Sequence, residues 1–125
     1  MTFSAWLFSA KLAWGKPWMR WLSLIALIFP IIVGNLFLLQ VVPSAQSQGN
    51  IVYHYNIYLG IDDVRAWWWA ILLPLTWFVL TLIDVVIAYG VYRIDSHFSA
   101  ALISFSIAWS LPWAGALFYL YLFNV

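Results

Sequence analysis

The chain has 125 residues, 66% of them hydrophobic and 7% charged, whereas ordinary soluble domains are about half apolar and about a quarter charged. Five basic and four acidic side chains are too few to cover a soluble fold, so most apolar surface must face lipid or other protein. A net charge of +1 without a dense basic cluster gives no indication of nucleic-acid binding. The absence of cysteine excludes disulfides, thiolate metal sites and cysteine nucleophiles. Together these features predict an all-α membrane protein.

The first segment, residues 1–20, is basic and amphipathic. Its three cations, unaccompanied by any acid, are Lys11, Lys16 and Arg20. Apolar residues recur at helical spacing at Phe3, Leu7, Ala10 and Trp14. We therefore expect a short helix lying in the membrane interface and ended by Gly15 and Pro17. Anchoring the span that follows is the simpler role for this helix, and a response to lipid is the alternative.

Residues 21–42 are apolar except at Ser23, Asn35 and Gln40. About 20 such residues, each rising about 1.5 Å, cross a hydrocarbon core of about 30 Å, which predicts the first transmembrane helix. The apolar run is longer than that of a usual signal peptide, so we interpret it as an uncleaved anchor. Pro30 is expected to bend this helix, and Gly34 to let a neighbouring helix come close.

The stretch 43–66 is interpreted as an external loop, and it begins with the turn-forming sequence PSAQSQGN. Across 51–59, apolar and more polar residues alternate, as in an extended segment with one apolar face. Because a lone strand is unstable, we expect it to lie on the aromatic ends of its own helices or to pair with a partner's strand. Gly60 is expected to turn the chain, and Asp62 or Asp63 to cap the next helix.

Two further transmembrane helices are predicted at 66–91 and 98–123, joined by a tight turn at 92–97. Most of the ten tryptophans lie near the ends of apolar runs, as in the aromatic belts of membrane proteins. Basic residues gather before the first span and in the 92–97 turn. The positive-inside rule then predicts that the N-terminus is cytoplasmic and that the 43–66 loop and the C-terminus are external or periplasmic.

Asp84 is an ionisable residue inside a predicted span, which makes it a candidate for function. Counted from the cytoplasmic end at about 1.5 Å per residue, it lies roughly 12 Å deep, at a depth similar to that of Ser104 and Ser106. We expect Asp84 to face the other helices and to bond to one of these hydroxyls. The alternatives are a structural polar clamp, a contact to another subunit, and proton or ion handling.

Two other polar residues, Asn35 and Ser110, are expected at one depth on the first and third spans. A hydrogen bond between them would contribute about 0.6 to 2 kcal/mol and help to specify helix packing. Ser106, Ser110 and Ala114 form a stripe of small residues where another backbone can come close.

The loop contains His54, Asp62 and Asp63, residue types that bind metals. Their spacing matches no metal-binding motif, and the acids have a competing role as helix caps, so we expect no metal here. The chain has no nucleophile with a base at recognisable spacing and no glycine-rich phosphate loop. We therefore expect a non-enzymatic protein without catalytic residues and without a cofactor.

The loop sequence HYNIYLGID begins at His54. It resembles the HYNIYFGID loop between the first two spans of small uncharacterised bacterial membrane proteins. More distantly, His54, Asn56, Gly60 and Asp62 resemble the loop that follows the first transmembrane helix in SdpI-type immunity proteins. The resemblance implies a bacterial inner-membrane protein whose external loop is a defined structural unit.

Three functions remain open from the sequence. The first is association, as an accessory subunit of a membrane complex or as a homo-oligomer, with the lipid bilayer and other membrane proteins as partners. The second is an SdpI-like receptor or immunity factor that binds an extracellular peptide. The third is a proton or ion conduit that uses Asp84.

Overall fold

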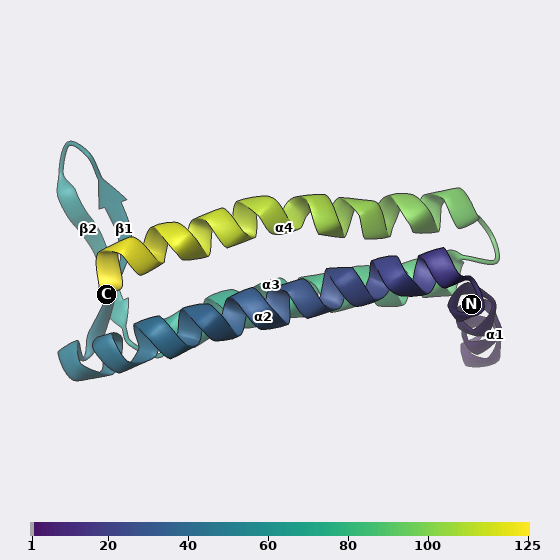
Figure 1. Cartoon of the computed structure of the whole chain (residues 1–125), viewed down its shortest axis with the longest axis horizontal. Helices are drawn as coiled ribbons and strands as arrows, with labels where there is room; N and C mark the ends of the chain where they lie inside the picture. The colour runs from purple at the N-terminus through teal and green to yellow at the C-terminus, as the bar shows by residue number, and fades with distance from the viewer. Residues whose placement is uncertain (1) are drawn as a thin grey trace. The chain divides into compact units, whose positions relative to one another are not determined.

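The structure is a computed structural model that describes residues 2–125, apart from the side chains of Asn56 and Asp62. Its elements in chain order are α1 (Phe3–Trp14), α2 (Pro17–Gln48), β1 (Asn50–Asn56), β2 (Gly60–Ala66), α3 (Trp69–Val91) and α4 (Ser96–Asn124) (Figure 1). Helices α2, α3 and α4 are each long and apolar enough to cross a membrane. The chain is therefore a small integral membrane protein that is mainly helical, as predicted, with one β-hairpin added.

Helix α1 is a separate element, as the sequence predicted. The Thr2 hydroxyl accepts a hydrogen bond from the Ala5 amide at 3.3 Å and caps the first turn. The helix ends at Trp14, and α2 begins at Pro17. Proline suits this first helical position because its φ angle is already helical and its missing amide would have had no partner there.

Helix α2 is longer than the predicted 21–42 span, and the loop predicted from Pro43 onward is wrong over its first part. The helix continues through Pro43 to Gln48. The Ser47 hydroxyl donates to the Ser44 carbonyl at 2.8 Å within this last turn. Gly49, with φ of 75°, then ends the helix in the left-handed conformation that glycine adopts at low cost.

The predicted extended segment is one strand of an antiparallel hairpin formed within the chain. Strands β1 and β2 pair from Asn50 with Ala66 to Asn56 with Gly60, with irregular register around His54. Residues 57–59 form the turn, and Gly60 has φ of 76°. The strand's partner is therefore β2 of the same chain, and not a strand of another protein.

The start of the second long helix also differs from the prediction. Asp63 lies in β2, and α3 begins at Trp69 instead of residue 66, so Asp63 does not cap this helix. The side chain of Asp62, the other predicted cap, lies outside the described residues. An acid does cap α4: Asp95 Oδ1 accepts from the amides of His97 and Phe98, each at 2.9 Å.

The chain divides into two compact units, and each contains parts of all three long helices. Unit 1 is Met1–Phe29 with Phe78–Leu111, and unit 2 is Pro30–Trp77 with Pro112–Val125. The division falls at Pro30 in α2 and at Pro112 in α4, where proline removes one hydrogen bond of the helix. Each unit has a buried apolar cluster of its own.

The core of unit 1 joins α1, α2, α3 and α4. Its buried members are Ala13, Met19, Ala26, Val85, Ala88, Tyr89 and Ile103. The core of unit 2 joins α2, α3 and α4 to the first residues of β1. Its buried members are Phe37, Val41, Ala45, Ile51, Ala70, Trp77, Leu117 and Leu120. Ile51 is fully buried, so the base of the hairpin belongs to the core of unit 2.

Candidate functional site

The hairpin lies beside the C-terminal end of α4 (Figure 1), and one side chain of this helix bonds to its base. Asn124 Oδ1 accepts a hydrogen bond from the Val52 amide at 2.7 Å, and Asn124 Nδ2 donates to the Val52 carbonyl at 2.8 Å. The same Nδ2 donates to the Leu120 carbonyl of α4 at 2.8 Å. The side-chain amide of Asn124 thus accepts from and donates to the backbone of β1, as the backbone of a neighbouring strand would, and it fixes the strand to the helix.

Aromatic stacking supports the middle of β1 on the same helix. The Tyr55 ring stacks on Phe123, with centroids 4.8 Å apart and planes inclined by 17°. The Tyr119 hydroxyl donates to the Tyr55 carbonyl at 3.2 Å. The expectation that the extended segment lies on the aromatic ends of its own helices is therefore confirmed for this strand.

Arg65 of β2 lies against two aromatic rings. Its guanidinium carbon is 5.0 Å from the Tyr53 centroid and 4.5 Å from the Trp69 centroid. The Arg65 Nε also donates to Asp63 Oδ2 at 3.0 Å. Both charged side chains are more than a third exposed, so the ion pair itself adds little stability, and the cation–π contacts orient Arg65.

The turn of the hairpin, residues 57–59, which we call the hairpin tip, is apolar and exposed. Ile57 is 82% exposed, Tyr58 92% and Leu59 76%. Ile61 and Val64 of β2 are more than half exposed as well. A cluster of apolar side chains presented on a turn whose base is fixed is typical of a surface that contacts another molecule.

The other loop residues named from sequence contribute little to a site. His54 is exposed and lies opposite Asp63 in the strand pairing. The side chain of Asn56 lies outside the described residues, as does that of Asp62. Among the residues that the structure describes, no three histidines or acids come together to hold a metal ion.

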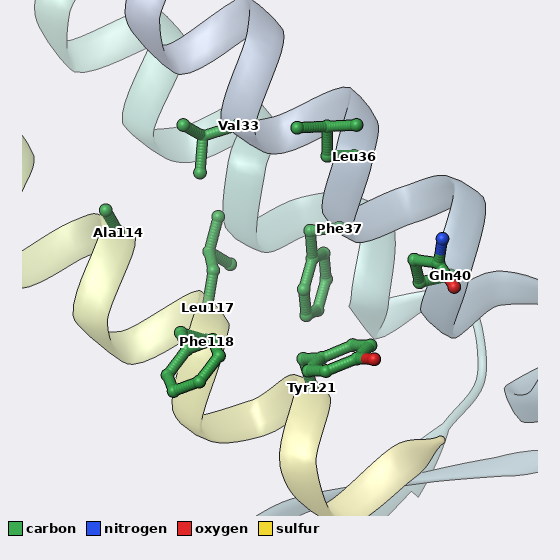
Figure 2. Close-up of a pocket in the computed structure, with 8 residues that line it drawn as sticks. All are labelled: Val33, Leu36, Phe37, Gln40, Ala114, Leu117, Phe118 and Tyr121. Carbon is green, nitrogen blue, oxygen red and sulfur yellow. The ribbon is translucent and has the colours of Figure 1, made fainter.

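An apolar groove in unit 2 runs between α2 and α4. Figure 2 shows Phe37 of α2 pointing toward Leu117 and Tyr121 of α4 across it. The groove has a volume of about 210 Å³. Its lining residues are Val33, Leu36, Phe37, Gln40, Ala114, Leu117, Phe118 and Tyr121. Six of these eight side chains are apolar, so the groove suits a lipid chain or a neighbouring apolar helix.

Asp84 in unit 1 has the partner that the depth count predicted. The Ser106 hydroxyl donates to Asp84 Oδ2 at 2.8 Å, whereas Ser104 is exposed. Ser106 itself is buried and Asp84 half-buried. This bond is the only one that Asp84 makes among the described residues. It joins α3 to α4, which is the structural clamp considered in the sequence analysis.

The predicted hydrogen bond between Asn35 and Ser110 is replaced by bonds within each helix. Asn35 Nδ2 donates to the Ile31 carbonyl at 2.7 Å, and the Ser110 hydroxyl donates to the Ser106 carbonyl at 2.9 Å. Each side chain is thereby satisfied by the carbonyl one turn earlier, which a depth count alone does not reveal.

The prediction for Gly34 is confirmed. A Cβ atom at Gly34 would lie 2.8 Å from Pro74 Cβ, closer than carbon atoms approach one another. Helix α3 therefore contacts the backbone of α2 directly at this glycine. Pro74 of α3 lies against the backbone of α2 at residue 34, and among the amino acids only glycine leaves room for it there.

Several residues that position the helices were missed by the sequence analysis. In unit 1 the Ser9 hydroxyl donates to the Tyr89 carbonyl at 2.8 Å and accepts from the Arg93 amide at 3.0 Å. The Ser99 hydroxyl donates to the Ala88 carbonyl at 2.7 Å. In unit 2 the missed residue is Asn124. These residues could have been recognised in the sequence as isolated polar residues within apolar helical segments, because a buried polar side chain must find a hydrogen-bond partner.

Comparison with known proteins adds no relative: no protein-family model and no curated protein matches the sequence, and no solved structure matches the fold.

Proposed function

We propose that this protein acts by association with other membrane proteins, as an accessory subunit of a larger complex or as a homo-oligomer. The hairpin tip makes the contact outside the bilayer. The single observation that carries the proposal is the exposure of Ile57, Tyr58 and Leu59 on a hairpin whose base is fixed. A turn exposed to water alone would more commonly carry polar residues and glycine.

The fixed base supports this function through preorganisation. A loop that is ordered before binding loses less conformational entropy when a partner orders it. Asn124 and the Tyr55–Phe123 stack hold β1 on α4, and Ile51 is buried in the core. The tip is therefore presented in one position, with an aromatic and two aliphatic side chains of the kind that anchor protein interfaces.

The proposed setting is the inner membrane of a bacterium. Helix α1 lies in the interface on the cytoplasmic side, and the hairpin lies on the external or periplasmic side. This orientation follows from the distribution of the cations: four of the five basic residues lie in unit 1, and Arg65 alone lies in unit 2. The protein carries out no catalysis of its own.

The test is purification of the tagged protein from its host in a mild detergent, followed by mass spectrometry of the proteins that accompany it at fixed stoichiometry. Replacing Ile57, Tyr58 and Leu59 together with serine should abolish the recovery of the partner without lowering the yield of the protein. Ile94→Ser is the matched control, because Ile94 is an apolar residue of the α3–α4 connector that is 78% exposed.

Three outcomes contradict the proposal. If the unaltered chain is recovered alone and as a monomer, association is not its function, and a receptor for an extracellular peptide takes its place. If the partner persists after the tip is replaced, the contact lies elsewhere on the protein. If Ile94→Ser also abolishes the recovery of the partner, exposed apolar residues in general, and not the hairpin tip in particular, bind the partner.

A further inference from the structure

Four basic side chains of unit 1 have no acidic partner within the described part of the chain. Lys11, Lys16, Arg20 and Arg93 make no ion pair and no side-chain hydrogen bond with any residue that the structure describes. The two acids of unit 1 are already engaged. Asp84 accepts from Ser106, and Asp95 Oδ1 caps α4. Unit 1 therefore has an uncompensated positive charge.

Aromatic rings orient two of these cations. The Arg20 guanidinium carbon lies 5.8 Å from the centroid of the Trp14 ring, and that of Arg93 lies 5.3 Å from the Phe8 ring. A guanidinium stacked on a ring keeps its N–H donors at the edge available for an anion. Arg20 is thus positioned to bind a negatively charged group beside Trp14.

Trp14 also forms part of a groove in unit 1 between α1, α2 and α3. The groove has a volume of about 190 Å³. Its lining residues are Trp6, Trp14, Ser23, Leu24, Leu27, Val85, Val86 and Tyr89. For comparison, an apolar cavity of about 150 Å³ binds one benzene molecule, so this groove has room for a segment of hydrocarbon chain.

Hydrogen bonds hold the walls of the groove in place. Trp6 Nε1 donates to the Val86 carbonyl at 3.2 Å, which fixes the indole of α1 against α3. The Ser23 hydroxyl lies 2.6 Å from the Met19 carbonyl and 3.1 Å from the Tyr89 hydroxyl. The one polar side chain apart from the aromatic rings is therefore satisfied inside the protein, and the surface that remains is apolar.

We propose that this groove binds one acyl chain of an anionic phospholipid, whose phosphate lies beside Arg20. The lipid supplies both features that the site lacks, a hydrocarbon chain for the groove and a negative charge for the unpaired cations. A zwitterionic phospholipid fills the groove equally well, but the basic side chains attract its headgroup less strongly because it has no net charge. This site is separate from the hairpin tip and does not depend on a protein partner.

The experiment uses the full chain in a mild detergent and measures lipid binding by native mass spectrometry. The probes are phosphatidylglycerol and phosphatidylcholine with identical acyl chains. Phosphatidylglycerol should bind more tightly, and Arg20→Gln should weaken its binding about fivefold, as expected for one cation near an anionic headgroup. Val86→Trp should block both lipids, because Val86 lines the groove and is 45% exposed, so a larger ring fits there without disturbing the core.

Arg65→Gln is the matched control, since Arg65 is the one basic residue of unit 2 and stacks on aromatic rings as Arg20 does. It should leave lipid binding unchanged. Equal binding of the two lipids by the unaltered protein would overturn the assignment of an anionic headgroup. An equal loss with Arg65→Gln would show unspecific attraction to charge. Displacement of phosphatidylglycerol by inorganic phosphate alone would make the site a free-phosphate site, and retention of lipid by Val86→Trp would exclude the groove.

Discussion

Unit 1 and unit 2 hold the same three helices together by different means. In unit 1, serine hydroxyls bond across helices: Ser9 and Ser99 donate to backbone carbonyls, and Ser106 to a carboxylate. In unit 2, large rings fill the space, as where Trp77 stacks on Trp113 with planes inclined by 4°. Unit 2 also contains the hairpin, which unit 1 lacks.

The difference predicts that the two units differ in how strongly a substitution destabilises them. Hydroxyl bonds between transmembrane helices contribute modestly, about 0.6 kcal/mol on average, because such groups also find partners when the helices are apart. Packed rings and a fixed hairpin depend on shape, and a change of shape cannot be relieved by another partner. We therefore expect substitutions in unit 2 to be more destabilising than substitutions of the polar contacts in unit 1.

The largest effect is expected for Asn124→Leu. This change removes three hydrogen bonds and leaves the Val52 amide and carbonyl without their partner on α4. The free energy of unfolding should fall by about 3 kcal/mol, since each buried group left unsatisfied costs about 1 to 3 kcal/mol. Unfolding by sodium dodecyl sulfate in mixed micelles measures the loss, and amide hydrogen exchange should quicken in β1.

Asn35→Leu is the control for this prediction, because Asn35 is exposed and bonds only to the Ile31 carbonyl of its own helix. Its effect should stay under about 1 kcal/mol. If both variants lose the same stability, the bond between Asn124 and β1 does not hold the hairpin.

A smaller loss is expected for Gly34→Ala. The new methyl group would lie 2.8 Å from Pro74 Cβ, and proline has no rotamer by which to move away. The free energy of unfolding should fall by about 2 kcal/mol, in the range for overpacking of a well-packed core. Gly115→Ala provides the matched test, since a Cβ atom there meets nothing within 4 Å. It should be neutral or stabilising by up to about 1 kcal/mol, because alanine favours a helix. A neutral Gly34→Ala would mean that α2 and α3 are not in close contact.

Hydropathy and depth were enough to predict one part of this fold. The spans follow from the length of the apolar runs, and the Asp84–Ser106 bond follows from the equal depth of the two residues on consecutive helices. Gly34 was recognisable because a glycine within an apolar helix usually has a packing role. These features depend on local sequence and on the thickness of the bilayer, which is the same for every chain.

The hairpin was missed because its second strand does not look like one. Residues 60–66 begin with glycine and contain two acids, which favour a turn and a helix cap, yet they pair with β1. The turn at 57–59 has none of the residues that usually mark a hairpin. Tertiary contacts decide the structure here: Asn124 bonds to Val52, and Arg65 packs on Trp69, and neither pair is visible in the local pattern.

The smallest effect is expected in unit 1, for Asp84→Asn. Asparagine keeps an oxygen that accepts from Ser106 and has nearly the same size, so the free energy of unfolding should change by less than about 1 kcal/mol. Ser106→Ala removes the same bond from the other side and should cost about 1 kcal/mol. If Asp84→Asn is the more harmful of the two in detergent, the carboxylate has a charged partner that Ser106 does not replace. A loss found only in native membranes would place that partner on another subunit, because the sodium dodecyl sulfate of the unfolding assay, unlike the mild detergent used for purification, separates subunits while leaving the bond between α3 and α4 intact.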